Sequence, residues 1–285
     1  MIKIRFLIIG GSGFIGTNLK EELVLRGQEV EIFDIRDKDN PRDVNIDKEL
    51  LFNSVKNCDV VFHLAAIPAH RLSVENPYKI ISNNYNATLN ILTACKAFEK
   101  KIIYASSFSV YGKQKPTWNE DTSLSCDTPY SHTKIASEQL LELYHKLYNT
   151  EVIIARLSNV FGPYEELHQP LQVLPIWFEC KKRGMPLIVN GKNTTRDFTY
   201  VFDIVNGLIL LSRQKGFNIF NICNGKETKI SDVAKEISDD VEIKDLPNYE
   251  AERWVGSNKK MRKLGWQPTK DIFEWVREQN MMGGK

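Results

Sequence analysis

The chain has 285 residues, of which 42% are hydrophobic and 26% are charged, and this length allows a buried core for one large domain or two smaller ones. Its formal net charge of +2 gives no long-range attraction for nucleic acid or an anionic membrane, so we expect neither as a partner. The five cysteines are odd in number and never spaced C-x-x-C, which argues against a disulfide framework or a metal site and fits the reducing cytoplasm.

Short apolar segments alternate with helical patterns over the first half of the chain. The expected strands are Ile4–Ile9, Glu29–Phe33, Val60–Leu64, Ile102–Ala105 and Val152–Leu157, and the expected helices are Ile15–Leu25, Asn84–Phe98 and Thr133–Leu147. Continuous apolar strands between helices predict a parallel sheet covered on both faces, in a Rossmann-like doubly wound α/β fold. No apolar stretch approaches membrane-spanning length, so we expect a soluble protein.

The pattern loosens after Phe161, where prolines and glycines separate shorter elements. We expect residues 1–162 to form the main domain, with return segments near residues 195–215 and 255–266. In the first return segment, Phe202–Leu211 is predicted to be a helix that packs back against the main sheet. Residues 163–285 are predicted to form mainly a smaller C-terminal α/β lobe.

A glycine-rich turn joins the first expected strand to the first expected helix. Gly10, Gly13 and Gly16 have the spacing G-x-x-G-x-x-G. One glycine makes the tight turn, one lets the backbone approach a pyrophosphate, and one lets helix and strand pack closely. The start of the helix then offers free N–H groups to phosphates. The strand–turn–helix context favours a dinucleotide site over a glycine turn without a ligand.

Asp34 ends the second expected strand, eighteen residues after Gly16. A carboxylate at this position accepts the ribose hydroxyls of NAD and repels the additional phosphate of NADP. Arg36 lies two residues further on and could soften that preference. We therefore expect NAD as the cofactor.

Three polar features are expected near the ends of successive strands. Ser107 follows the strand Ile102–Ala105, and Asn84 is expected at the start of a helix. Tyr130 and Lys134 are four residues apart, so they share one helix face. A nearby ammonium, together with the positive nicotinamide ring of NAD, lowers the pKa of a phenol from its ordinary ~10, which would let Tyr130 act as a base. An isolated Tyr-x-x-x-Lys is more often a surface pair, but the glycine turn and the serine favour catalysis here.

Further motifs recur in the order and spacing of a known family. They are His63-Leu64-Ala65-Ala66, the segment from Arg156 to Pro163, Arg196-Asp197-Phe198, and the segment from Leu264 to Pro268. Over nearly its whole length the sequence resembles the extended short-chain dehydrogenase/reductase family, within it the UDP-glucose 4-epimerase-like NAD-dependent nucleotide-sugar epimerases and dehydratases. This resemblance implies a nucleotide-diphosphate-sugar substrate held by the C-terminal lobe. It also implies a homodimer formed through the helices at 84–98 and 133–147.

The resemblance implies roles for individual residues. Ser107, Tyr130 and Lys134 would be catalytic, and Ser107 would hydrogen-bond the sugar oxygen from which Tyr130 removes the proton. Asn159, Arg196 and Arg253 would contact the substrate diphosphate, since guanidinium groups bind phosphate in bidentate fashion. A structural salt bridge is the alternative for Arg196, and the match at Arg253 is looser. The cofactor-binding positions would be Gly10, Gly13, Phe14, Ile15, Gly16, Asp34, Ile46, Leu64, Ala65, Ala66, Asn84, Tyr130 and Lys134.

Departures from the family pattern narrow the chemistry. Dehydratases of the family usually carry Asp-Glu where this chain has Phe108-Ser109, and decarboxylases usually have Glu at 109. The proton shuttle for expelling water from the sugar is therefore missing. Removal of a hydride and its return, which epimerises C4, is the chemistry that remains. His70 stands where small or aliphatic residues are common, and we interpret it as substrate-shaping or exposed rather than as an additional acid or base.

Two alternatives stay open. A reductase of nucleotide-linked 4-keto sugars would use the same serine, tyrosine and lysine but would consume the cofactor. A non-catalytic NAD-binding module is more remote, because such proteins usually lose the tyrosine or the lysine, and this chain keeps both Tyr130 and Lys134.

Overall fold

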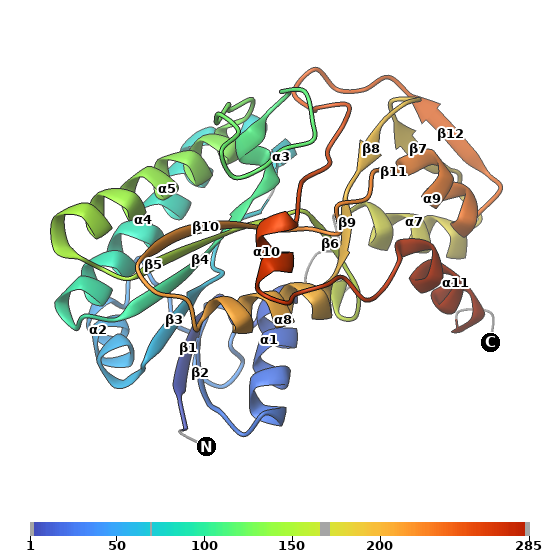
Figure 1. The fold of residues 1–285 in the computed structure, drawn as a ribbon. Coiled ribbons are helices and arrows are strands. Elements are labelled where there is room, and N and C mark those ends of the chain that lie inside the picture. The colour runs from blue at the N-terminus through green and yellow to red at the C-terminus, as the bar shows by residue number, and fades with distance from the viewer. Residues whose placement is uncertain (1–2, 69, 166–171, 283–285) are drawn as a thin grey trace.

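The computed structural model describes residues 3–68, 70–165 and 172–282. Six strands form a central sheet in the order β10-β5-β4-β3-β1-β2, and every neighbouring pair is parallel (Figure 1). The predicted parallel α/β fold is therefore confirmed. The chain order reverses between β1 and β3, and open α/β sheets bind ligands outside the carboxyl ends of the strands at such a point. The strands are β1 (Arg5–Ile9), β2 (Glu29–Phe33), β3 (Val60–His63), β4 (Lys101–Ser107), β5 (Val152–Leu157) and β10 (Phe217–Ile222).

Helices cover both faces of this sheet and bury its apolar side chains. Leu19 of one helix and Leu208 of another pack against Ile8 on one face, while Ile91 and Leu141 lie in the core on the other face. Because both faces are covered, the inner strands β1, β3, β4 and β5 are mostly apolar on both sides, whereas the edge strand β2 alternates glutamates with apolar residues. The first face carries α1 (Phe14–Leu25), α8 (Val201–Leu211) and α10 (Lys259–Lys263), and the second carries α2 (Lys48–Asn57), α4 (Pro77–Ala97) and α5 (Pro129–Tyr148).

Two helices begin earlier than the sequence predicted. Both α4 and α5 start with a proline in the first turn, and the preceding residue caps the helix. The Asn76 side chain accepts a hydrogen bond from the backbone N–H of Lys79, and Thr128 accepts one from Ser131. Asn84 consequently lies about two turns inside α4, so its expected place at a helix start is wrong.

The central sheet is completed by a strand from far along the chain. Helix α8 spans Val201–Leu211, one residue longer than predicted, and packs against α1. The chain then enters β10 at the edge of the sheet, beside β5. Strand β10 lies outside the expected return segments near 195–215 and 255–266, while Met261 and Trp266 of the second segment are in the same core as α8. The division at residue 162 stays a prediction.

A smaller lobe packs around a separate apolar core that includes Trp177, Val233 and Trp275. Parallel β7 (Leu187–Asn190) and β12 (Val241–Lys244) pack against α9 (Ile230–Ile237), and β7 also packs against α7 (Val173–Lys182), while α11 (Ile272–Met282) packs against α9 (Figure 1). The remaining elements are α3 (His70–Glu75), the 3₁₀ turn η1 (Phe108–Tyr111), the parallel pair β6 (Asn159–Phe161) and β9 (Phe198–Tyr200), and the antiparallel pair β8 (Thr195–Arg196) and β11 (Thr228–Lys229).

Membrane-spanning helices and metal-binding clusters are both absent from the described residues. Within residues 3–68, 70–165 and 172–282, none of the helices has the length and apolarity needed to cross a membrane. The same part of the chain gathers no cluster of three or more histidine, cysteine or acidic side chains able to hold a metal ion.

Candidate active site

The glycine turn brings three backbone segments into close contact. Gly10 has a φ of +89°, and a Cβ there would lie 2.5 Å from the backbone N of Ala65. A Cβ at Gly16 would lie 2.4 Å from the carbonyl oxygen of Gly10. Only glycine allows this packing of β1, α1 and the loop after β3. Gly13 precedes Phe14 of α1 without a side-chain cap, so the N–H groups of the first helical turn are available to a phosphate.

Asp34 lies at the carboxyl end of β2, where the sequence predicted a ribose contact. Its buried carboxylate accepts hydrogen bonds from the backbone N–H groups of Ser12, at 2.9 Å, and Arg36, at 2.8 Å. Each carboxylate oxygen keeps a further lone pair for a ribose hydroxyl. The Arg36 guanidinium reaches over the turn, since a Cβ on Gly13 would lie 3.0 Å from its Nη2. This donor and acceptor set fits NAD.

The remaining residues expected to contact the cofactor differ in whether their polar groups are already hydrogen-bonded and in how exposed they are. The Asn84 amide is already engaged, because Oδ1 accepts from the backbone N–H of Ile67 at 2.9 Å and Nδ2 donates to Thr133 Oγ1 at 3.4 Å. Asn84 therefore braces the loop after β3 against α5. Leu64, Ala65 and Ala66 lie in that loop, partly buried, while the Ile46 side chain is 75% exposed. Their contacts with a cofactor stay predictions.

The three residues predicted to be catalytic meet at the carboxyl end of β4. Tyr130 lies in the first turn of α5, and its hydroxyl is hydrogen-bonded to the side chain of Ser107. Lys134, one turn later, donates from Nζ to the carbonyl oxygen of Ala105 at 2.7 Å. Its Nζ lies 5.9 Å from the centre of the Tyr130 ring. Because both Tyr130 and Lys134 are buried, bulk water does not screen this pair.

The pKa of the tyrosine departs from the expectation. Burial raises the pKa of Tyr130 to about 12, and the hydrogen bond from Ser107 only partly opposes this shift. Lys134 by itself therefore does not lower the pKa of Tyr130, and the lowering expected from Lys134 together with the nicotinamide ring stays a prediction. Burial also lowers the pKa of Lys134 to about 7, against the opposing charge of Glu138. Desolvation disfavours both charged forms, and the Lys134 ammonium is directed at the Ala105 carbonyl rather than at the phenol.

A buried ion pair lies next to these residues and was missed as a functional feature by the sequence reasoning. Arg156 of β5 binds Glu138 of α5 in bidentate fashion, with Nη2 2.7 Å from Oε2 and Nε 3.1 Å from Oε1. Glu138 Oε1 also accepts from Ser106 Oγ at 2.5 Å. Ser106 precedes Ser107, and Glu138 lies one turn after Lys134. The spacing 130, 134, 138 on one helix face was the available signal.

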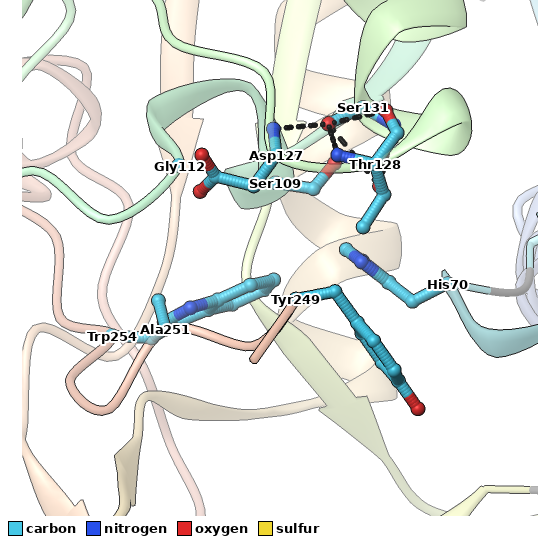
Figure 2. Close-up of a pocket in the computed structure, with 9 residues that line it drawn as sticks. All are labelled: His70, Ser109, Gly112, Asp127, Thr128, Ser131, Tyr249, Ala251 and Trp254. Carbon is cyan, nitrogen blue, oxygen red and sulfur yellow. Dashed lines mark hydrogen bonds between the residues drawn. The ribbon is translucent and has the colours of Figure 1, made fainter. Parts of the chain in front are cut away.

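A small cavity opens beside Tyr130. The His70 ring centre lies 5.1 Å from that of Tyr130 and 5.7 Å from that of Trp254. Burial, with a smaller contribution from Arg196, lowers the pKa of His70 to about 4, so the imidazole is neutral near pH 7. The ring is packed into the site, in keeping with a substrate-shaping role. Nine residues line the cavity (Figure 2): His70, Ser109, Gly112, Asp127, Thr128, Ser131, Tyr249, Ala251 and Trp254.

The two arginines expected at the substrate diphosphate are paired with carboxylates. Arg196 is buried, donates from Nη2 to Glu250 at 3.0 Å, and stacks 5.0 Å over the Trp254 ring. Arg253 is more exposed and contacts both oxygens of Glu227 at 2.7 Å. Arg196 thus forms the kind of salt bridge that was considered as its alternative role.

Asn159 lies close to the arginine pair in the fold. Its backbone N–H donates to the carbonyl oxygen of Asp197, the residue after Arg196, and Thr195 forms a β-bridge with Arg253. All three residues predicted to bind the diphosphate are therefore brought to one region by the β6–β9 and β8–β11 pairs. Their contact with a phosphate stays a prediction.

Residues 6–223 match the model of a family described as "NAD dependent epimerase/dehydratase family". A putative UDP-glucose 4-epimerase of Methanocaldococcus jannaschii is 32% identical over 297 residues, covering 95% of each chain. A UDP-N-acetyl-alpha-D-glucosaminuronate decarboxylase of Bacillus cytotoxicus is 36% identical over 260 residues, covering 83% of this chain and 80% of its own. The crystal structure of UDP-glucose 4-epimerase from Thermus thermophilus, a complex with NAD, has a TM-score of 0.86 at 27% identity and covers 96% of this chain and 97% of its own.

Proposed function

The chain belongs to the NAD dependent epimerase/dehydratase family, and on that premise we propose that it interconverts the C4 epimers of a nucleotide-diphosphate sugar. The observation that carries the proposal is the meeting of Ser107, Tyr130 and Lys134 at the carboxyl end of β4, on the same edge of the sheet as the glycine turn. Relatives and similar structures named as 4-epimerases support it. UDP is the nucleotide named for these relatives and is our first choice.

The side chains divide the proton chemistry between them. Ser107 and Tyr130 share a hydrogen bond, so one sugar oxygen placed beside them can bond to both. Tyr130 then withdraws the proton of the C4 hydroxyl, while Lys134 supplies positive charge one helical turn away. Bound NAD supplies the hydride acceptor and a positively charged ring beside the phenol. Burial raises the pKa of Tyr130 to about 12, so the phenol alone is protonated near pH 7, and the positive ring of bound NAD would favour its ionisation.

The absence of a carboxylate after Ser107 favours epimerisation over the related eliminations. Phe108 and Ser109 are both buried, and neither side chain can protonate a departing hydroxyl as a carboxylic acid would. Oxidation at C4 gives a 4-keto sugar, and the simplest reaction that remains for it is return of the hydride to the opposite face of the ring. The cofactor is regenerated in each turnover, and this separates the proposal from a 4-keto sugar reductase.

The test is to incubate the NAD-loaded protein with UDP-glucose, UDP-galactose and their N-acetyl forms and to follow each by chromatography. We expect interconversion within at least one pair and no net loss of NADH. Tyr130→Phe should lower the rate at least ~100-fold while NAD still binds, because the base is lost and the cofactor cradle is not. Failure to interconvert any of these sugars, or an undiminished rate in Tyr130→Phe, would contradict the assignment.

The protein is further proposed to act in the cytoplasm as a homodimer. The cysteines within the described residues are free thiols, which supports a reducing compartment. Helices α4 and α5 pack side by side and expose apolar side chains, which supports a shared helical interface. Light scattering should give twice the chain mass. Leu89→Asp combined with Leu143→Asp should give a monomer, whereas Leu25→Asp at the exposed end of α1 should not. The exposed apolar side chains on these helices are Tyr78, Ile81, Leu89, Leu143, Leu147 and Tyr148.

A further inference from the structure

We infer that the cavity beside Tyr130 binds the ring of an uncharged hexose through Ser109 and Trp254 and discriminates against uronic acids. The inference rests on the proposed function, because the reacting C4 must touch Tyr130 and the rest of the sugar ring must then lie next to it. Two residues that line the cavity contact catalytic side chains. His70 packs against Tyr130, and the backbone N–H of Ser109 donates to Ser107 Oγ at 3.2 Å.

Two polar groups of the cavity lining lack a partner within the described residues. They are the hydroxyl of Ser109, whose side chain is 2% exposed, and the indole Nε1 of Trp254. Buried polar groups are nearly always hydrogen-bonded, so these two groups in one cavity are available to bond a molecule that enters it. A hydroxyl can donate and accept, whereas an indole N–H only donates. Sugar hydroxyls match both requirements.

The charges around the cavity decide between neutral and acidic sugars. Among its nine lining residues Asp127 alone is charged, and its charge is negative. The imidazole of His70 is held neutral by burial and by the charge of Arg196. Arg196 stands behind the Trp254 ring, and it donates to Glu250 and to the carbonyl oxygen of Ala251. No cation of the described residues is therefore free in this cavity.

A uronate would be strongly disfavoured in such a site. Its carboxylate would leave water, would find no free cation, and would stand near Asp127. A hydroxymethyl or acetamido group carries no such charge, so glucose- and N-acetylglucosamine-type sugars fit the lining. This separates the chain from the relative named as a glucosaminuronate decarboxylase, with which it shares 36% identity.

The cavity must also widen to admit a sugar. Its volume is about 10 Å³, which is roughly the space for one water molecule. The imidazole of His70 and the indole of Trp254 meet edge to face across it and come from α3 and from the segment after β12 (Figure 2). Entry of a hexose therefore separates these two rings, which brings Ser109 and the indole N–H into contact with the sugar.

The first experiment compares UDP-glucose, UDP-N-acetylglucosamine and UDP-glucuronate on the NAD-loaded protein, by calorimetric binding and by epimerisation. We expect the uronate to bind and react ~100-fold less well than the better neutral sugar. A uronate that binds within threefold of the neutral sugars would overturn the inference. Because binding needs no turnover, a preference for neutral sugars without any epimerisation would refute the proposed function and leave the inference supported.

Variants of the lining provide the second experiment. Ser109→Ala and Trp254→Phe should each raise KM for the preferred neutral sugar about 3- to 10-fold, since each removes one hydrogen bond to the sugar. Ser109→Ala should leave the melting temperature unchanged, because its hydroxyl has no partner among the described residues to lose. The matched control is Ser212→Ala, whose buried hydroxyl donates to Ile209 O at 2.7 Å and whose loss should lower the melting temperature and not raise KM. Wild-type KM in both cavity variants would overturn the assignment.

A gain of function completes the test. Asp127 is exposed on one side, so Asp127→Lys can be tolerated by the fold and places a cation at the cavity. We expect this variant to reduce the ratio of affinities for the neutral sugars over UDP-glucuronate at least ~10-fold. An unchanged preference would show that charge at the cavity does not select the sugar and would overturn the inference.

Discussion

Replacing Glu138 by glutamine removes the negative charge from the buried ion pair that lies next to Ser107 and Lys134. The Arg156 and Glu138 side chains are 3% and 4% exposed, so little water can replace the lost partner. Glutamine keeps one oxygen for the guanidinium but turns an amide N–H₂ toward it. Arg156 would retain its bonds to the Tyr111 hydroxyl, at 3.0 Å, and to the carbonyl oxygen of Glu120, at 3.2 Å.

The structure sets the size of this effect. Removing one member of a buried pair typically costs about 3–5 kcal/mol, because the other charge is left uncompensated. Glutamine keeps one oxygen that can accept from Arg156, so we expect the lower end of this range. Glu138→Gln should therefore reduce the free energy of unfolding by about 3 kcal/mol. The matched control is Glu142→Gln, one turn further along α5. Glu142 pairs with Lys146 at the surface, where such pairs contribute at most about 1 kcal/mol.

Glu138→Gln should also change the pH dependence of catalysis. Burial holds the pKa of Lys134 near 7, and the Glu138 charge opposes that depression. Without the carboxylate the pKa of Lys134 falls further, so less of it is charged at a pH of about 7.5. The alkaline limb of kcat/KM should therefore move to lower pH, with activity partly recovered on acidification. Urea unfolding and a pH–rate profile measure the two effects. A stability within about 1 kcal/mol of the wild type with an unmoved alkaline limb would refute the reasoning.

Three further predictions concern the cofactor, the second lobe and the substrate. Gly16→Ala places a Cβ 2.4 Å from the backbone oxygen of Gly10, so the NAD affinity measured by calorimetry should fall at least ~10-fold. An unchanged affinity would show that the glycine turn does not bind the cofactor. Burial raises the pKa of the Asp197 carboxyl from 3.8 to about 6, so the folded protein binds the carboxyl proton more tightly than the unfolded chain does. Protonation of Asp197 therefore stabilises the fold by about 3 kcal/mol at low pH, and this contribution is lost as the pH rises through 6. The asparagine of Asp197→Asn does not titrate, so only the wild type loses stability as the pH rises. The difference in free energy of unfolding between wild type and variant, measured in urea, should therefore shrink between about pH 4 and about pH 6.5. If the Arg253 guanidinium leaves Glu227 to bind the substrate phosphate, Arg253→Ala should raise KM about tenfold with little change in the urea midpoint of unfolding. An unchanged KM would show that Arg253 forms only a surface salt bridge.

Most of the central sheet could be predicted from local pattern. Strands Glu29–Phe33 and Val152–Leu157 were placed to the residue. Val152–Leu157 is buried along its whole length and is mostly apolar, whereas Glu29–Phe33 is an edge strand in which glutamates alternate with apolar residues, and either pattern predicts a strand. The helix starts were less accessible, since Asn76 and Thr128 cap helices whose first turns lack the apolar spacing used to find them. Strand β10 was missed because its place beside β5 depends on a pairing between segments far apart in the sequence.

The sequence determined the parts of the site that local geometry dictates. Glycines at 10, 13 and 16 and a tyrosine and a lysine one helical turn apart act through spacings that the backbone alone fixes. Only the tertiary structure decided the rest. It raised the pKa of Tyr130 through burial, engaged Asn84 with Ile67, paired Arg196 with Glu250, and brought Trp254 against His70. Desolvation and partner choice depend on which distant segments meet, and no spacing along the chain encodes that.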